Sequence, residues 1–176
     1  MRPVTKLLIT VISGFYLACL LMPGLEEHLY LNRYLVLNLG EYWRLLTVAL
    51  THGGIMHLFF NMYALLILGN SLESAIGQKK FLAIFLISQL GASLASIYFS
   101  AFNVVSVGAS GAIFGLFGAL IVVSKRYGLE TKQTFVIIGI NFAIGFIFPG
   151  IDWRAHLGGL IAGFIAASVL LSPTRS

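Results

Sequence analysis

Four polar side chains that could carry out chemistry lie within or at the ends of strongly apolar segments: His57, Asn61, Ser110 and His156. A serine beside a histidine can act as a nucleophile activated by a general base. A histidine and an asparagine one helical turn apart face the same way and could donate hydrogen bonds to a developing oxyanion. Taken singly, however, a serine can simply cap a helix, and a histidine can simply bond a neighbouring helix.

The composition indicates the environment in which these side chains must work. Hydrophobic residues make up 59% of the 176 residues, charged residues make up 10%, and the mean hydropathy is +0.95. A water-soluble domain with a polar surface could hardly reach such values, so we expect an integral membrane protein surrounded by lipid. Six crossings of about 20 residues would fill the chain. We therefore expect one domain over residues 1–176.

The apolar residues form six runs that are separated by charges, Gly, Pro or Asn, as the ends of helical segments usually are. The runs cover residues 7–22, 55–72, 81–101, 110–124, 134–148 and 156–172. No Asp or Glu lies inside any of them. The predicted fold class is an all-α membrane protein, a bundle of six transmembrane helices.

The basic residues predict how the bundle is oriented. An even number of crossings brings both termini to one side, and cytoplasmic loops carry the excess of Lys and Arg. With cytoplasmic termini, eight basic residues lie inside and three outside; the eight are Arg2, Lys6, Lys79, Lys80, Lys125, Arg126, Lys132 and Arg175. This topology explains the net charge of +5 without a nucleic-acid partner. So small a bundle suggests the plasma membrane of a prokaryote.

Helix geometry places three of the four polar residues at one depth. Counted from the predicted cytoplasmic ends of their helices, Ser110, His57 and His156 lie at roughly 22, 24 and 25 Å, the last measured from Pro173. The fourth run has only 15 residues, so we expect residues 101–109 to enter the membrane as irregular backbone. Such backbone is tolerated there when it is buried in protein or lines a wet cavity. A serine at its end would meet water.

Glycines predict close contact between the helices that carry Ser110 and His156. Gly111, Gly115 and Gly118 share one face of the first helix, and Gly159 and Gly163 share the face of His156 on the other. Small residues let two membrane helices approach closely. We therefore expect Ser110 to reach His156.

Five short motifs resemble those of the rhomboid family, in family order and with the spacing of six helices. They are Gly108-Ala109-Ser110-Gly111, Ala155-His156-Leu157-Gly158-Gly159, His57 with Asn61, Trp43-Arg44 in the first loop, and Glu73 with Gly77. The resemblance spans residues 43 to 163. One departure is Phe114, because many rhomboids have Tyr four residues after the serine. The ring that stacks on the histidine is kept.

The resemblance implies a serine endopeptidase with a Ser110–His156 dyad and no catalytic acid. Its expected partners are the lipid bilayer and transmembrane proteins, which it cleaves near the outer ends of their helices. No metal or organic cofactor is implied. Asp152 could approach His156 from the loop but is left out of the catalytic set. His52 could support the site or simply lie at the membrane border.

Two other readings remain open. His52, His57 and His156 could ligate haem or a metal between helices, although that leaves the motif around Ser110 unexplained. The chain could also be an inactive rhomboid relative that only binds membrane segments. Such proteins typically lack the serine or the histidine, and both are present in this sequence.

Overall fold

The computed structural model describes residues 1–101, 103–147 and 151–172, so that Pro173 and Arg175 lie outside it. Its elements in chain order are α1 (Pro3–Leu21), η1 (Glu26–His28), β1 (Leu31–Asn32), α2 (Arg33–Leu39), α3 (Arg44–Thr47), η2 (Val48–Leu50), α4 (Ile55–Ile76), α5 (Gln78–Phe99), β2 (Val105–Ser106), α6 (Ser110–Arg126), α7 (Lys132–Ile147) and α8 (Trp153–Leu170). The fold is mostly helical, as predicted.

Six long helices occupy the positions of the six predicted apolar runs. Within the described residues, four of them are long and apolar enough to cross a membrane: α1, α4, α5 and α8. Helices α6 and α7 have 17 and 16 residues, fewer than the roughly 20 of an ordinary crossing. The structure thus has four candidate spans, and the count of six stays a prediction.

Two helix boundaries differ from the predicted ones for a local reason. Helix α8 begins three residues before His156, because the side chain of Asp152 accepts a hydrogen bond from the amide of Ala155 and caps the helix. Helix α4 runs on to Ile76, which places Glu73 inside a span rather than after it. The predicted end of this helix at residue 72 is therefore four residues too early.

The buried Glu73 carboxylate has its partners on another helix. It accepts hydrogen bonds from the amides of Val4 and Thr5 at 3.0 and 2.8 Å, and from the Thr5 hydroxyl at 2.8 Å. The first N–H groups of a helix have no partner within that helix. Glu73 supplies the acceptor for two of these N–H groups in α1 and so fastens the beginning of α1 to the end of α4.

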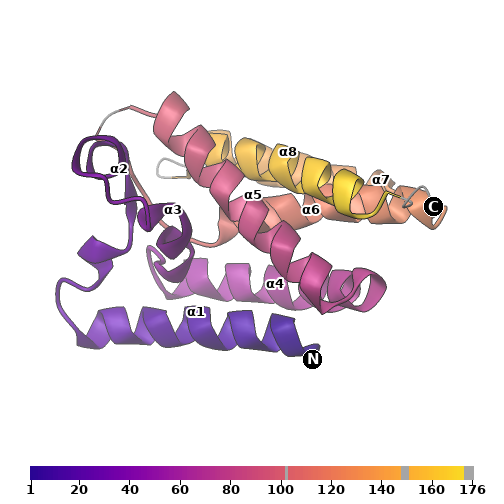
Figure 1. The fold of residues 1–176 in the computed structure, drawn as a ribbon, viewed down its shortest axis with the longest axis horizontal. Helices are drawn as coiled ribbons and strands as arrows, with labels where there is room; N and C mark the ends of the chain where they lie inside the picture. Colours follow the sequence, from indigo (N-terminus) through magenta and orange to yellow (C-terminus); the bar gives the residue numbers. More distant parts are fainter. Residues whose placement is uncertain (102, 148–150, 173–176) are drawn as a thin grey trace.

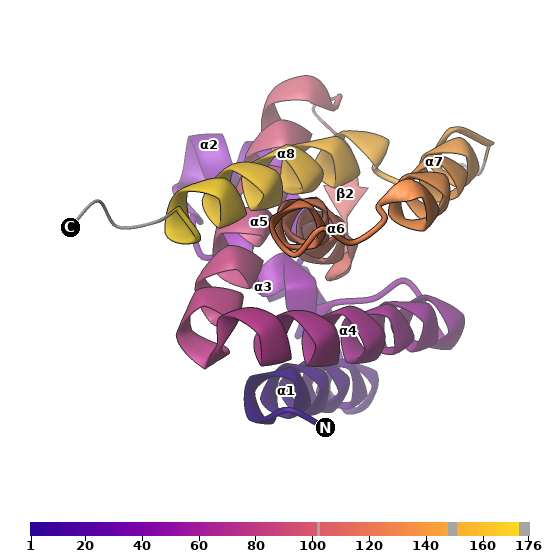
Figure 2. The same ribbon diagram turned by 90° about the vertical axis from the view of Figure 1, so that its right-hand side faces the viewer.

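Helix α6 lies at the centre of the bundle. Figure 2 looks nearly along α6, with α8, α5, α4 and α7 around it and α1 outside α4. Most residues of α6 are buried, including three glycines and three alanines or leucines that face its neighbours. In Figure 1, α1 begins and α8 ends at the same end of the bundle. The element that begins with Ser110 is thus the one most enclosed by protein.

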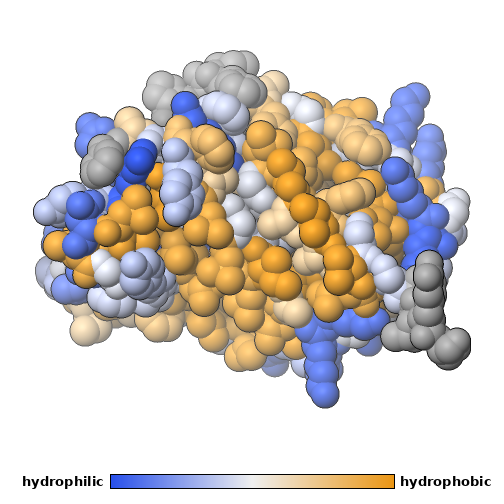
Figure 3. Space-filling view, turned by 45° about the horizontal axis from the view of Figure 1, so that its top comes forward, coloured by the Kyte–Doolittle hydropathy of each residue, from blue (hydrophilic) through white to orange (hydrophobic). Residues whose placement is uncertain are grey.

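The surface matches a protein held in lipid. In Figure 3 an apolar band covers the middle of the visible face, and hydrophilic residues gather at both ends. Many large apolar side chains are exposed, for example Leu21, Phe60 and Val169. Such a band would be unfavourable in water and is what a hydrocarbon environment requires.

A short sheet connects the first loop to the segment before α6. Strand β1 pairs antiparallel with β2, so that Leu31 lies opposite Ser106 and Asn32 opposite Val105. The amide of Gly108 donates to the carbonyl of Val48 at 3.0 Å. The described backbone before Ser110 is therefore non-helical, but it includes strand β2 where irregular backbone was predicted, and it is held from two sides.

Candidate active site

Ser110 and His156 meet across the interface between α6 and α8. The distance from Ser110 Oγ to His156 Nε2 is 2.9 Å, within hydrogen-bonding range. His156 is 7% exposed and Ser110 is half-buried as the first residue of α6. The sequence placed these residues at one depth, and the structure brings them into contact. The pair has the geometry of a nucleophile and its general base.

Glycines make this contact possible. A Cβ atom on Gly159 would lie 2.0 Å from the carbonyl oxygen of Gly111, and one on Gly163 would lie 2.1 Å from that of Gly115. Likewise, a Cβ atom on Gly118 would lie 2.3 Å from the Leu160 carbonyl. These are clashes with backbone that cannot turn aside. The predicted close contact of α6 and α8 is therefore confirmed, although the missing Cβ atoms of Gly111 and Gly115 point first toward Ala92 and Ser88 of α5.

An aromatic ring orients the histidine. The Phe114 ring stacks on the His156 imidazole with centroids 4.1 Å apart and planes 10° apart. Phe114 also contacts Phe142 of α7 edge to face, with centroids 5.2 Å apart. The expectation that Phe114 keeps the ring which stacks on His156 is confirmed.

His57 lies against the backbone that leads to Ser110. A Cβ atom on Gly108 would lie 2.8 Å from Cε1 and 3.0 Å from Nε2 of His57, so only glycine fits here. Gly108 also has a φ of +111°, a conformation that other residues rarely adopt. The amide of Gly53 donates to His57 Nδ1 at 3.4 Å, which leaves the ring hydrogen on Nε2, the nitrogen near Gly108.

Asn61 lies one turn further along α4 and is buried. Its Nδ2 donates to the His57 carbonyl at 2.9 Å, while among the described residues its Oδ1 has no hydrogen-bond partner. One Nδ2 hydrogen remains for another acceptor. Neither His57 nor Asn61 forms a hydrogen bond with Ser110 in the part of the chain that the structure describes. Their predicted part in stabilising an oxyanion stays a prediction.

The ring of His52 packs against the ring of His57. Its ring makes edge contacts with Tyr16 and His57, with centroids 6.4 and 5.1 Å away. Burial, aided by repulsion from His57, lowers the pKa of His52 to about 3, so the ring is neutral at pH 7. Both of its nitrogens are buried without a hydrogen-bond partner among the described residues. His52 thus packs against His57, one of the candidate oxyanion donors.

Trp43 and Arg44 differ in burial although they are adjacent. Arg44 is 3% exposed and donates to the carbonyls of Glu27 and Tyr30, both at 2.8 Å, and to the Glu41 carboxylate at 2.5 Å. Trp43 is exposed and donates to the carbonyl of His28 at 3.1 Å. Arg44 therefore anchors the first loop.

The structure also bears on the metal-binding alternative and on Asp152. Across residues 1–101, 103–147 and 151–172, no three His, Cys, Asp or Glu side chains are grouped closely enough to hold a metal ion. His156 Nδ1 is buried and has no hydrogen-bond partner there. The Asp152 carboxylate instead bonds Ser96, Ser106 and the amide of Ala155. Among the described residues, His156 therefore has no hydrogen-bonded carboxylate partner.

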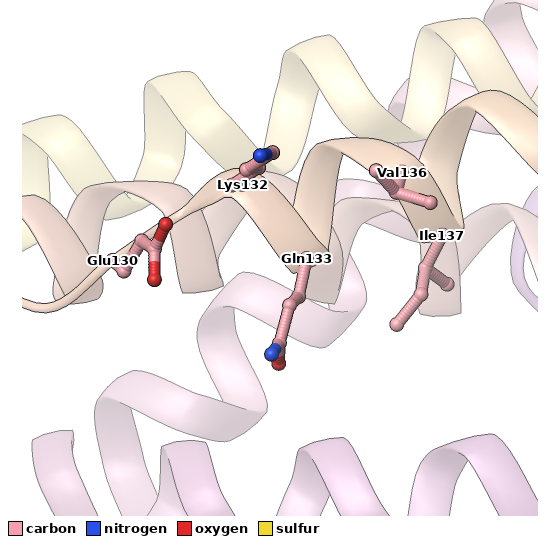
Figure 4. A pocket seen from close by; sticks show the side chains of 5 residues that line it. All are labelled: Glu130, Lys132, Gln133, Val136 and Ile137. Carbon is pink, nitrogen blue, oxygen red and sulfur yellow. The ribbon is translucent and has the colours of Figure 1, made fainter.

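Two hollows on the surface lie away from Ser110 and His156. One of about 580 Å³ follows the start of α7, where Glu130, Lys132, Gln133, Val136 and Ile137 line it (Figure 4). Another of about 460 Å³ lies where α6 and α8 end, beside Lys80 and Arg126. Ser110 and His156 line neither hollow.

Sequence reasoning missed two residues of this region, Ser96 and Ser106. Both are serines in or beside apolar segments, and nothing in their local pattern distinguishes them from the other serines of the chain. Asp152 was noticed only for its spacing from His156. A polar residue at membrane depth is a signal in itself, but its partners depend on tertiary structure.

Comparison with known proteins agrees with this geometry. Residues 39–173 match the rhomboid domain. The chain is 46% identical over 139 residues to rhomboid protease GluP of Bacillus subtilis (strain 168), which covers 76% of this chain and 27% of that protein. It is 41% identical over 158 residues to RHOMBOID-like protein 5 of Arabidopsis thaliana, which covers 85% and 50%. The chain therefore spans half or less of the length of these two relatives.

Proposed function

The chain belongs to the rhomboid family, and we propose that this membrane protein is an intramembrane serine endopeptidase that cleaves the transmembrane segments of other membrane proteins. The observation that carries the proposal is the 2.9 Å contact between Ser110 Oγ and His156 Nε2. The similarity to a rhomboid protease supports it. The substrates are transmembrane proteins, and no nucleic acid takes part.

In the proposed mechanism His156 Nε2 accepts the hydroxyl proton of Ser110 as Oγ attacks the carbonyl carbon of the scissile peptide. The tetrahedral intermediate then collapses, and the imidazolium gives its proton to the leaving amine. Water, deprotonated by the same nitrogen, hydrolyses the acyl-enzyme and restores Ser110. With Asp152 bonded elsewhere, two residues perform the proton transfers.

The developing oxyanion needs hydrogen-bond donors, for which three groups are proposed. Nε2–H of His57 faces the Gly108 backbone, and one Nδ2 hydrogen of Asn61 is left after its bond to the His57 carbonyl. The amide of Ser110 is the third group, because no side chain caps the start of α6. The positive end of the α6 dipole adds to their effect.

The proposed arrangement in the membrane has six spans in one domain, residues 1–176, with both termini in the cytoplasm of a prokaryotic cell. Helices α6 and α7 would then be spans that are shorter than usual, and the irregular segment before Ser110 would fill the remaining depth. The apolar band between two polar ends supports a membrane-spanning bundle (Figure 3), and the excess of basic residues in the predicted cytoplasmic segments supports the orientation. Substrates would be cut near the outer end of their helices.

A cleavage assay with a transmembrane reporter in liposomes tests the function. Wild-type protein should cut the reporter, whereas Ser110→Ala and His156→Ala should each abolish cleavage, because nucleophile and base act as a unit. Ser168→Ala is the matched control, since that hydroxyl only bonds the carbonyl of Phe164 on its own helix. A fluorophosphonate should label wild type and spare Ser110→Ala. Cleavage by Ser110→Ala would overturn the dyad, and an inactive wild type would favour a rhomboid relative that only binds membrane segments.

A further inference from the structure

The Asp152 carboxylate lies where three segments of the chain meet. Its Oδ1 accepts from the amide of Ala155 at 3.1 Å and so caps α8. Its Oδ2 accepts from the hydroxyls of Ser96 and Ser106 at 2.5 and 2.7 Å. The two hydroxyl oxygens are 3.0 Å apart. One carboxylate therefore joins α8 to α5 and to strand β2.

The positions of these residues relate them to the dyad. Ser106 precedes Ser110 by four residues, and Asp152 precedes His156 by four. The 2.7 Å bond between Ser106 and Asp152 thus links the segment that leads into α6 to the first turn of α8. The Ser110–His156 contact joins the same two segments again, four residues further along each of them.

Burial makes the link stronger than a surface hydrogen bond. Ser96 is 3% exposed, and Ser106 and Asp152 are half-buried. A hydrogen bond to a carboxylate in a low dielectric is strong, and leaving it unmade is unfavourable. On its other side Ser106 is held opposite Leu31 by the β1–β2 pairing. The segment before Ser110 is thus fixed between the first loop and α8.

We propose that Asp152 and Ser106 are positioning residues that set the distance between Ser110 and His156. They touch neither the substrate nor the reacting atoms. The inference rests on the proposed function, since it concerns how well the two dyad residues are aligned for proton transfer. Alignment affects the catalytic rate strongly, because a misplacement of about 1 Å can reduce that rate by up to about 100-fold.

A simpler role for Asp152 is to cap α8 alone, and Ser106 separates the two roles. Ser106→Ala removes the link to β2 and leaves the Asp152–Ala155 bond in place. Ser106→Thr keeps a hydroxyl at that position. Ser168→Ala again serves as the control, because it also removes a hydroxyl, at the opposite end of α8.

The experiment measures reporter kcat and KM, and the rate constant of fluorophosphonate labelling at Ser110, for wild type and each variant. Ser106→Ala should lower kcat and the labelling rate by about 10- to 100-fold, with KM little changed and labelling still complete at long times. Ser106→Thr should restore most of the loss. Asp152→Ala combined with Ser106→Ala should be no slower than Asp152→Ala alone, because the two residues act through one contact.

Any of three results would overturn the inference. One is a wild-type labelling rate in Ser106→Ala; another is a loss confined to thermal stability, with kcat per labelled site unchanged. Multiplicative losses in the double variant would also contradict it. The same double-mutant cycle, read as free energy of unfolding, measures the Asp152–Ser106 contact without any activity. If wild-type protein is inactive but Asp152 and Ser106 are coupled in the free energy of unfolding, the proposed function is rejected while the contact between the two residues is confirmed.

Discussion

The imidazole of His156 lies face to face with the ring of Phe114, with centroids 4.1 Å apart and planes 10° apart. An aromatic pair contributes about 0.5–1.5 kcal/mol beyond burial. If the stack holds His156 in the orientation that reaches Ser110, Phe114→Leu should lower kcat by about 2- to 13-fold. Phe114→Tyr should retain activity because it keeps the ring.

Reporter kinetics at saturating substrate would measure this effect, with circular dichroism melting to confirm that each variant is folded. Phe99→Leu offers a matched control, since that ring is 73% exposed at the end of α5. A wild-type kcat in Phe114→Leu would show that the stack is not needed for orientation.

The proposed oxyanion donors predict a graded loss. Removing one donor from the oxyanion hole of a serine protease reduces kcat by about 10²–10³-fold. The loss of kcat in His57→Ala and in Asn61→Ala should lie in that range. Both variants should keep a higher kcat than Ser110→Ala, because several donors share one charge. Single-turnover cleavage of the reporter would separate this step from substrate binding.

Stability must be followed beside these rates, since both side chains are also packed. His28→Ala is a suitable control because that histidine is exposed and its carbonyl, not its ring, bonds Trp43. Native kcat in both His57→Ala and Asn61→Ala, with unchanged melting, would leave the Ser110 amide to act with other donors.

The contact between α6 and α8 predicts a strong effect of one methyl group. In Gly159→Ala the new Cβ would meet the Gly111 carbonyl oxygen at 2.0 Å, so the two helices must separate. We expect a lower melting temperature and loss of cleavage. Gly14→Ala, in α1, meets nothing within 4 Å and should gain up to about 1 kcal/mol from helix propensity. Equal behaviour of the two variants in a melting assay would argue against close packing as the reason for these glycines.

The charge distribution predicts the topology. In a Cys19→Ser background, which removes the single cysteine, a cysteine introduced at Glu130 should be shielded from an impermeant maleimide in intact cells. A cysteine introduced at Tyr42 should be labelled. The α6–α7 connection would then be cytoplasmic and the α2–α3 connection outside. The reverse labelling pattern would show that the bundle has the opposite orientation in the membrane.

The dyad could be predicted from sequence because its evidence is local. Ser110 lies 15 residues before Lys125 and His156 lies 17 residues before Pro173, so a rise of about 1.5 Å per residue already brings them to one depth. The glycines on both helices add that the backbones must touch, and the structure confirms this contact. The positions of the helices followed from the apolar runs in the same way.

The partners of isolated polar residues could not be predicted. Asp152 has three hydrogen-bond donors, and two of them, Ser96 and Ser106, come from segments 56 and 46 residues away. Glu73 was expected after its helix because a charge usually ends an apolar run, but its acceptor oxygens are satisfied by α1. Such pairings depend on how helices pack, and hydropathy does not encode that.

The attachment of α1 to α4 has a consequence for how the protein is made. The acceptor for the Thr5 amide, the carboxylate of Glu73, lies 68 residues further along the chain. At about 5–20 residues per second, synthesis reaches Glu73 roughly 3–14 s after Thr5. During that interval the first turn of α1 is left to water at the membrane border. Helix α1 packs chiefly on α4 (Figure 1), so these two helices can dock before α6 and α8 emerge from the ribosome.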